Sequence, residues 1–566
     1  MKNTSYINEN REFDERADYL EQEDLYKWTV NNEHFQNIQK KLLEKGAKLL
    51  VGPRGTGKTH QFRLAHYRCQ EEKKFPLSVY VSFGKYYRLE PLLYKSSNAM
   101  NIFHAWVLAK IVYSCYELLS DFDHLEYNLL YSNILSKDDI KNFIQIAERY
   151  DSIPEFDELI RFISIQKVID ILNDMKVFFK RKRIIVFLDD AALTLTPEFM
   201  IEFFDIFRSL KTNLISPKAS VYPGTTQYGP RFHIGQDAEE VSAWLKVDSE
   251  EYEDFMLSLL SQRFNEINDV PKEIIQLLMY AAFGIPRALI SLLRDYMGNT
   301  GKTTQQKFNN VLSERRDLLK NEYLSLTLKI PQYNSIINIG YDLFEKTLQE
   351  INNANKENPK EKQITMGILV EDSQAHREER MMRLLIEAGL FYKITEVKDG
   401  PNRVFNRYIP HFLFLIQNGT FNKTKGFNPK ETIESIYKKT NKRPLRKQFS
   451  TILSKEILNN IKLDLPSCGK CGTPRLKDDQ KFCHNCANPL IGQSAFESCL
   501  KISIEELPIS QWQKEKIKNE TKFNKLEDIV VSQSPAAELK KIKGIGNKRS
   551  SKIMNIVNTI LDEFLS

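Results

Sequence analysis

The run from Gly52 to Thr59 fits the pattern G-x-x-x-x-G-K-T, which in phosphate-binding loops surrounds the phosphates of a nucleotide. Its glycines let the backbone turn tightly with several N–H groups facing one way. We expect Lys58 to reach the β- and γ-phosphates and the Thr59 hydroxyl to ligate Mg²⁺. The loop therefore predicts binding of ATP with Mg²⁺, by Gly52, Pro53, Arg54, Gly55, Thr56, Gly57, Lys58, Thr59 and His60.

Such a loop needs a strand before it and a helix after it. The short and mostly apolar run 47–51 suits a buried parallel strand, and residues 60–71 contain no glycine or proline and read as a helix. The start of that helix would add its positive dipole end beneath the phosphates. These flanking elements argue against the alternative, a chance glycine-rich turn.

A second strand of the same kind ends in two acids. Residues 184–188 are all apolar, and Asp189 and Asp190 follow where a parallel sheet places its ligands. We expect Asp189 to hold Mg²⁺. Asp190 stands where many such ATPases have a glutamate that polarises the attacking water, and its side chain is one methylene shorter, so hydrolysis should be slow. The alternative role for the pair is capping of the next helix.

Two further polar positions follow along the chain. Residues 219–222 form a short strand leading to Thr225, which we expect to contact the γ-phosphate or the attacking water; Thr226 is the rival, and plain turn chemistry is the alternative. Gly284 and Pro286 then break one helix and open another. That order could aim Arg287 at the nucleotide from a helical lid, and the alternative is a surface arginine.

This set of motifs resembles the AAA+ ATPases, in particular the origin-recognition and replication-initiator type. The resemblance covers about residues 25–300 and, more loosely, the segment to 415. It implies that a neighbouring subunit supplies an arginine finger, for which Arg231 is a candidate. It also implies that the Walker A, Walker B, sensor 1 and sensor 2 positions are Lys58 and Thr59, Asp189 and Asp190, Thr225, and Arg287 respectively.

The segment after the lid indicates a helix, a strand, a turn and a returning strand. Residues 380–388 are amphipathic, 390–394 alternate, 398–401 carry a turn signal, and 403–408 return. This is the ending of a winged helix, which follows the ATPase module in the initiator family. Such a domain can grip DNA or pack against protein, and both remain open.

Four of the seven cysteines cluster as two Cys-x-x-Cys pairs separated by eleven residues. This spacing places four thiolates for tetrahedral zinc, and Gly472 supplies the tight turn of the first pair. A site closed by four protein ligands is structural, and zinc binding would drive folding of so small a module. The predicted zinc ligands are Cys468, Cys471, Cys483 and Cys486.

The C-terminal segment resembles the hairpin of a helix-hairpin-helix motif. Residues 540–552 carry six bases and no acids, which suits a phosphate track. Backbone N–H groups at the start of its second helix can bind a DNA phosphate. A protein-docking hairpin is the alternative, and residues 504–531 lack a second Gly-x-Gly. The predicted nucleic-acid contacts are Lys543, Gly544, Ile545, Gly546, Lys548 and Arg549.

The 566 residues predict an α/β P-loop (AAA+) core with a helical lid, then a winged helix, a zinc ribbon and a small all-α helix-hairpin-helix module. No apolar run approaches the roughly 20 residues that cross a bilayer, and the start lacks a signal-peptide core, so we expect a cytoplasmic protein without membrane contact. The expected divisions are an acidic segment 1–24, a core 25–245 with a helical insertion at about 90–180, a lid 246–318, a winged-helix-like domain 319–418, a basic linker region 419–464, a zinc ribbon 465–492 and a helix-hairpin-helix-like domain 493–566.

Charge and motifs together favour an ATP-binding and ATP-hydrolysing switch that engages nucleic acid. Residues 423–462 carry eleven bases against three acids, and the first 24 residues carry eight acids against three bases. Double-stranded DNA is the expected partner, with a homo-oligomer or an effector protein beside it, by analogy in a mobile-element or defence setting. The alternatives are a nucleotide-dependent protein-interaction scaffold with little hydrolysis, and a metabolic P-loop kinase, against which the rear modules argue.

Overall fold

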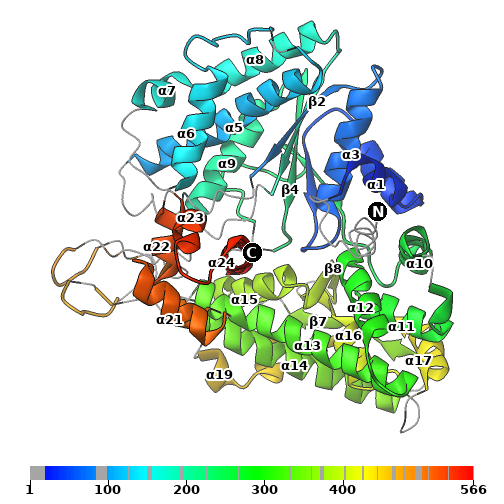
Figure 1. Ribbon diagram of the computed structural model, residues 1–566. Helices are drawn as coiled ribbons and strands as arrows, with labels where there is room; N and C mark the ends of the chain where they lie inside the picture. The colour runs from blue at the N-terminus through cyan, green and yellow to red at the C-terminus, as the bar shows by residue number, and fades with distance from the viewer. Residues whose placement is uncertain are drawn as a thin grey trace, which may run out of the picture.

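The molecule divides into an upper lobe around a parallel sheet, a lower lobe of helices around a smaller sheet, and a C-terminal group of helices beside them (Figure 1). Residues outside the described set include Thr225 and Cys499. The computed structural model describes residues 20–83, 89, 98–124, 126–149, 156–190, 197–224, 226–264, 267–330, 333–358, 360–369, 375–400, 403–422, 426, 428–442, 444–459, 461, 467–468, 470–475, 480, 482–488, 490, 500–507, 509–532 and 534–564.

Five parallel strands form the upper sheet, in the order β2-β3-β4-β1-β5. Every residue of β3 and β4 is buried, as strands with helices on both faces require. The three strands expected around the nucleotide are present as β1, β3 and β4, and β4 separates β1 from β3. The strands are β1 (Lys48–Val51), β2 (Leu77–Ser82), β3 (Ile184–Asp189), β4 (Ile215–Val221) and β5 (Glu239–Ser242).

Helices cover both faces of this sheet because successive strand residues point to opposite sides. In β1, Leu50 packs with Phe62 on one face, whereas Leu49 packs with Trp106 on the other. The first face carries α2 (Glu33–Leu43) and α3 (Lys58–Glu71), with α1 (Gln22–Lys27) packed on α3. The second face carries α5 (Ala99–Asp121), α6 (Lys137–Arg149), α7 (Asp157–Phe162), α8 (Ile165–Phe178) and α9 (Pro197–Leu210).

Helix α5 belongs to the stretch that the sequence marked as a helical insertion. Its length and apolar composition would allow it to cross a membrane, but 72% of its most apolar window is buried inside the protein. It packs against β2, α6, α8 and α9, so it is a core helix of the upper lobe. The apolar residues of α5 therefore fill the interior of the upper lobe. Sequence analysis did not recognise this helix as an apolar segment of membrane-spanning length.

The lower lobe begins after β5 with the helices that the sequence assigned to a lid. Its small sheet has the order β11-β7-β9-β8, and β6 pairs with β10. The strands are β6 (Lys362–Gln363), β7 (Met366–Leu369), β8 (Phe391–Lys398), β9 (Val404–Pro410), β10 (Lys439–Thr440) and β11 (Leu445–Lys447). The helices are α10 (Tyr252–Arg263), η5 (Ile267–Asp269), α11 (Lys272–Ala281), α12 (Pro286–Gly298), α13 (Thr304–Lys329), α14 (Asn334–Glu357), α15 (Ala375–Glu387), α16 (Phe412–Gln417), α17 (Pro429–Ile436), α18 (Phe449–Ile452) and α19 (Lys455–Asn459).

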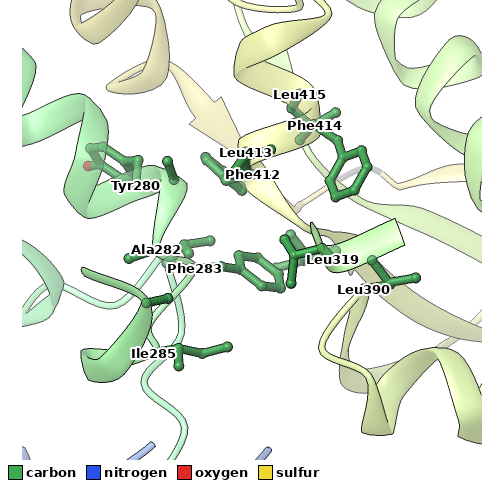
Figure 2. Packing of buried hydrophobic residues seen from close by; sticks show 14 of the residues in the cluster. Tyr280, Ala282, Phe283, Ile285, Leu319, Leu390, Phe412, Leu413, Phe414 and Leu415 are labelled. Carbon is green, nitrogen blue, oxygen red and sulfur yellow. The ribbon is translucent and has the colours of Figure 1, made fainter. Parts of the chain in front are cut away.

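One hydrophobic core runs through this whole lobe. Phe283 and Ile285, next to α12, pack in the same cluster as Leu319 of α13, Leu390 and Phe412 (Figure 2). The expected boundary between 318 and 319 falls inside α13. The stretch 419–464, expected as a basic linker, contributes β11 to the sheet and packs α17 on α11. The lid and the segments behind it are therefore one packed body.

The C-terminal segment has a core of its own. Leu507, Ile517 and Leu526 pack with Leu539 and Ile553 in a cluster separate from the two lobes. Its elements are η7 (Ile504–Glu506), α21 (Gln511–Glu520), α22 (Leu526–Val531), α23 (Pro535–Lys540) and α24 (Asn547–Phe564). A core of this size supports an independently folded module of short helices.

Candidate nucleotide site and metal centre

The loop between β1 and α3 has a conformation that its glycines make possible. Gly55 and Gly57 take φ values of 81° and 84°, in the left-handed region. The Thr56 hydroxyl donates to the Pro53 carbonyl at 2.8 Å, and a Cβ on Gly52 would lie 2.5 Å from that hydroxyl oxygen. The Gly52 N–H donates to the Val221 carbonyl at 3.2 Å, which ties the loop to the end of β4.

Lys58 is a buried cation held by neutral oxygens. Its Nζ donates to the carbonyls of Gly52 at 2.6 Å and Pro53 at 3.1 Å. Burial lowers the pKa of Lys58 to about 7, against the opposing charges of Asp190 and Asp189. Both acids therefore lie near enough to act on the ammonium. A buried ammonium bonded to carbonyls fits a phosphate anion as its partner, so this donor set suits a nucleotide.

Asp189 ends β3 with its carboxylate 1% exposed and hydrogen-bonded at both oxygens. The Tyr80 hydroxyl donates to Oδ2 at 2.9 Å, and the Asp190 N–H donates to Oδ1 at 3.0 Å. Sequence reasoning missed Tyr80, although its place on the neighbouring strand β2 could have indicated it. A carboxylate has lone pairs beyond these two bonds, so Asp189 retains the capacity to ligate Mg²⁺ directly or through water.

Asp190 adopts a left-handed backbone with φ of 55°. Its N–H also donates to the Ser220 hydroxyl of β4 at 2.9 Å, so the residue after β3 is fixed against the neighbouring strand. The described part of helix α9 begins at Pro197. A strained backbone at a sheet's ligand edge is typical of functional positions.

The tip of β4 lies against the phosphate-binding loop, through a residue that the sequence analysis did not select. Thr225 lies outside the described residues. The Thr226 hydroxyl donates to the Tyr222 carbonyl at 2.8 Å and accepts from the Tyr222 N–H at 3.2 Å, so it closes its own turn. The Tyr222 ring instead covers Lys58, with 4.0 Å between Nζ and the ring centroid, and Arg54 lies 5.9 Å from the same centroid.

Arg287 lies at the start of α12, against the loop. Its N–H donates to the Gly55 carbonyl at 3.2 Å, and a Cβ on Gly55 would lie 2.8 Å from the Arg287 Cβ. The charge of Arg287 also contributes to lowering the pKa of Lys58. The predicted lid arginine is thus beside the loop, whereas Arg231 has a side chain 75% exposed and lies 4.0 Å from Asp205.

His60, predicted at the nucleotide, contacts the segment before β1. Its Nε2 lies 3.0 Å from the Thr29 hydroxyl, and its ring centroid lies 6.0 Å from that of Phe35. Burial, and then the charge of Arg263, lower the pKa of His60 to about 4. The neutral His60 ring therefore packs the segment before β1, at Thr29 and Phe35, onto α3.

The four predicted zinc ligands converge, with their Sγ atoms all within 4.8 Å of one another. The Sγ separations of Cys468–Cys486 and Cys471–Cys483 are both 3.5 Å. Tetrahedral zinc with Zn–S bonds of about 2.3 Å separates its sulfurs by about 3.8 Å, so the set fits zinc. Hydrogen bonds from Thr473 lower the pKa of Cys471 to about 6, which favours the thiolate that binds metal.

The two cysteine pairs sit in matching turns. The Gly472 N–H donates to the Cys468 carbonyl at 2.8 Å, and the Ala487 N–H donates to the Cys483 carbonyl at 2.9 Å. Gly472 and Ala487 occupy equivalent left-handed positions, with φ of 71° and 54°. The tight turn expected at Gly472 is confirmed, and His484 between the second pair of cysteines is exposed and outside the sulfur cluster.

The C-terminal hairpin joins α23 to α24. The Lys543 N–H donates to Glu520 Oε2 at 3.3 Å, and Arg549 donates to the Gly544 carbonyl at 2.7 Å. A Cβ on Gly544, where φ is 99°, would lie 2.8 Å from the Trp512 ring. Arg549 also lies 5.5 Å from the centroid of that ring. The predicted residues 543–549 are thus together at the start of α24 beside one exposed tryptophan.

A parallel sheet with a glycine-rich loop after β1 and an acid at the end of β3 defines a P-loop α/β protein. The chain belongs to the ORC-CDC6-like family, whose model matches residues 13–380. Similar solved structures include a Walker-type ATPase of Pyrococcus abyssi, 17% identical with a TM-score of 0.38, covering 69% of this chain and 95% of that chain. Another is the ORC1 protein of Aeropyrum pernix in complex with DNA, 12% identical with a TM-score of 0.32, covering 72% and 93%. No curated protein gives a significant match.

Proposed function

We propose that this protein is a cytoplasmic ATP-dependent switch that hydrolyses ATP slowly and engages double-stranded DNA. The convergence of Lys58, Asp189 and Arg287 on one loop is the observation that carries the nucleotide part. Lys58 and the loop N–H groups would hold the phosphates, and Thr59 with Asp189 would hold Mg²⁺. Membership of the ORC-CDC6-like family supports the same assignment.

Bound Mg²⁺ would neutralise negative charge on the phosphates. Residues of the chain itself orient the Asp189 carboxylate that would hold the ion. Tyr80 and the Asp190 backbone hold the Asp189 carboxylate from two sides, so its orientation is fixed before any ligand arrives. Asp190 would position the attacking water, with a reach one methylene shorter than glutamate. This shortness supports slow turnover and a protein that spends long periods with nucleotide bound.

The DNA part of the proposal rests on two rear elements. Helix α15 with the β8–β9 hairpin supports a winged helix, but Arg403 and Arg446 both pair with Asp399 and Arg407 donates to Thr395. The Asp399 carboxylate therefore partly neutralises Arg403 and Arg446, whereas the oxygens that Arg407 contacts are neutral. The basic hairpin of the C-terminal module, proposed as a helix-hairpin-helix, is the stronger candidate for phosphate contacts.

This proposal assigns a separate role to each part of the protein. The upper lobe binds nucleotide, the lower lobe combines lid and winged helix, and the zinc ribbon spaces them from the DNA-binding hairpin. A second copy of the chain or an effector protein would complete the assembly. Four cysteines in one cluster suit a ribbon whose zinc holds a short segment folded.

Nucleotide and DNA binding can be tested separately. A fluorescent ATP analogue should bind the wild-type chain and lose affinity in Lys58→Ala, and duplex DNA should bind more tightly with ATP than without. Replacing Lys540 and Lys543 by glutamine should weaken DNA binding, whereas the matched control Lys302→Gln, on an exposed turn of the lower lobe, should not. Unchanged DNA binding by Lys58→Ala and by a chain lacking residues 500–566 would refute the proposal.

The alternative is a protein-interaction scaffold, favoured by the same short Asp190. Salt separates the two functions because each phosphate that the protein neutralises releases counterions and steepens the logarithmic salt dependence of DNA affinity by about 0.9. Trp512 provides a local signal, since it is 42% exposed whereas Trp28, Trp106 and Trp244 are all under 10% exposed. Quenching of tryptophan fluorescence by duplex DNA would therefore report contact near the hairpin.

A further inference from the structure

The turn that ends β4, residues 222–224, touches both the phosphate-binding loop and the lower lobe. We propose that this turn carries the state of the loop to α15, with Tyr222 as the positioning residue that reads Lys58. The inference rests on the proposed nucleotide function and adds to it the path by which bound nucleotide would act on the rear of the protein. Each link of that path is a contact between named residues.

The first link is the stack of Tyr222 on Lys58. Tyr222 is 7% exposed, and its ring centroid lies 4.0 Å from Nζ. An ammonium has three donors, and the carbonyls of Gly52 and Pro53 take two of them. A phosphate anion that takes the third donor attracts the ammonium, and this attraction competes with the contact between Nζ and the Tyr222 ring. Anion binding therefore changes the contact that Tyr222 makes.

The second link makes the turn stiff. The Thr226 hydroxyl bonds both the N–H and the carbonyl of Tyr222, so the backbone on either side of the ring is held at two points. The strand residue directly before the turn, Val221 of β4, is fully buried. A shift of the Tyr222 ring thus moves the following residues instead of being absorbed by a loose backbone.

The third link is a backbone-to-backbone contact between lobes. Gly224 has φ of 91°, and a Cβ there would lie 2.6 Å from the Arg383 carbonyl oxygen and 3.2 Å from the Arg383 Cα. Only glycine allows this approach, because any side chain would strike the backbone of α15. The turn is seated directly on the helix with no side chain between them.

The fourth link is the core that α15 belongs to. Met381, Leu384 and Leu385 are buried in the same cluster as Tyr280 of α11 and Phe412 of α16. Displacing α15 therefore displaces the lid and the small sheet with it. Beside the turn lies a cavity of 1080 Å³, lined by Tyr222, Gly224, Met382 and Arg383, which leaves room for such movement.

A second contact between the lobes gives the movement a direction. The Arg287 N–H donates to the Gly55 carbonyl of the loop, and Gly224 contacts the Arg383 backbone at the end of the turn that begins with Tyr222. Arg287 and Arg383 both belong to the lower lobe, so one body touches the loop at Gly55 and the turn at Gly224. A change at Tyr222 would pivot that body about the Arg287 contact.

Hydrogen exchange of the whole chain, with and without ATP and Mg²⁺, tests the path. We expect nucleotide to change amide exchange in residues 377–387 of α15 several-fold. At nucleotide concentrations that saturate each variant, Tyr222→Leu should lose that change, and Tyr222→Phe, which keeps the ring, should retain it. Tyr228→Leu is the matched control, since Tyr228 lines the same cavity and packs on Phe204 and Phe232.

Gly224→Ala gives a second reading that does not depend on Tyr222. Its methyl group should wedge the turn off α15 and change exchange there even without nucleotide. A full nucleotide response in Tyr222→Leu, an equal loss in Tyr228→Leu, or no effect of Gly224→Ala would overturn the inference. If the wild-type chain bound no nucleotide, the proposed function would fail as well; nucleotide binding with no response in α15 would overturn this inference alone.

Discussion

Replacing Phe283 by alanine should loosen the whole lower lobe. Phe283 is 1% exposed and lies between elements from both sides of the expected lid boundary. Its ring centroid is 5.5 Å from that of Trp244, 4.7 Å from that of His411 and 6.1 Å from that of Phe412. Figure 2 shows Phe283 and Phe412 together in the core. If these segments form one core, a hole at Phe283 must weaken helices on both sides of it.

The expected cost is about 3–5 kcal/mol, the range for truncating a buried phenylalanine to alanine. Phe283 already has a left-handed backbone with φ of 55°, and alanine would carry the same strain, so that contribution cancels. Phe283→Gly would relieve about 1 kcal/mol of strain while leaving the same cavity. Glycine should therefore be the less damaging of the two substitutions.

Native-state hydrogen exchange measures this locally, because a chain with several cores need not unfold in one step. The slowest amides of α11 and of α16 should both exchange faster by a factor on the order of 10²–10⁴ in Phe283→Ala. Phe143→Ala, a buried residue of the upper lobe, should accelerate α6 and leave α11 and α16 unchanged. Acceleration of α11 alone would refute the single core.

Three further predictions concern separate sites. Cys471→Ser should release zinc, measured by a chromogenic chelator, and unfold the ribbon while nucleotide affinity stays at the wild-type value; loss of both would contradict separate modules. Asp190→Asn should reduce phosphate release at least tenfold and keep nucleotide affinity within about threefold, since the amide cannot act as a base; unchanged turnover would exclude Asp190 as the residue that positions water. Burial, and then the charge of Arg315, lower the pKa of His411 to about 3. Between pH 6.5 and 3 the unfolded chain binds a proton at this histidine and the folded chain does not. The free energy of unfolding that His411 contributes above pH 6.5 should therefore fall by about 1.4 kcal/mol per pH unit as the pH drops from 6.5 toward 3. His411→Asn, which can still accept from the Leu413 N–H, should flatten that slope in acid titrations followed by circular dichroism, and an unchanged slope would count against His411.

Local patterns were sufficient for the elements around the loop. The strands ending at Val51, Asp189 and Val221 and the helix starting at Lys58 follow from short apolar runs and glycine placement, which act over a few residues. The cysteine cluster was equally readable, because its spacing alone sets which sulfurs can meet. In both cases the chemistry is carried by residues close together in the chain.

Contacts between distant segments were not readable in this way. Tyr80 and Tyr222 became visible as neighbours of Asp189 and Lys58 only once the parallel sheet placed β2 and β4 on either side of β3. The division expected at 318–319 falls inside α13, and an apolar helix face does not say which later segment covers it. The single core of the lower lobe depends on α16, which lies about a hundred residues beyond α13.

The sequence by itself determined three chemical sites: a phosphate-binding loop, an acid at a strand tip and a four-thiolate cluster. Each is set by residues spaced closely along the chain. Tertiary structure alone decided which distant residues contact the loop and its surroundings. It set the Tyr222 ring on Lys58 and the Gly224 backbone on α15, and it merged lid and rear segments into one body. The physical reason is that close packing between segments depends on sheet order and on mutual shape, which no local pattern encodes.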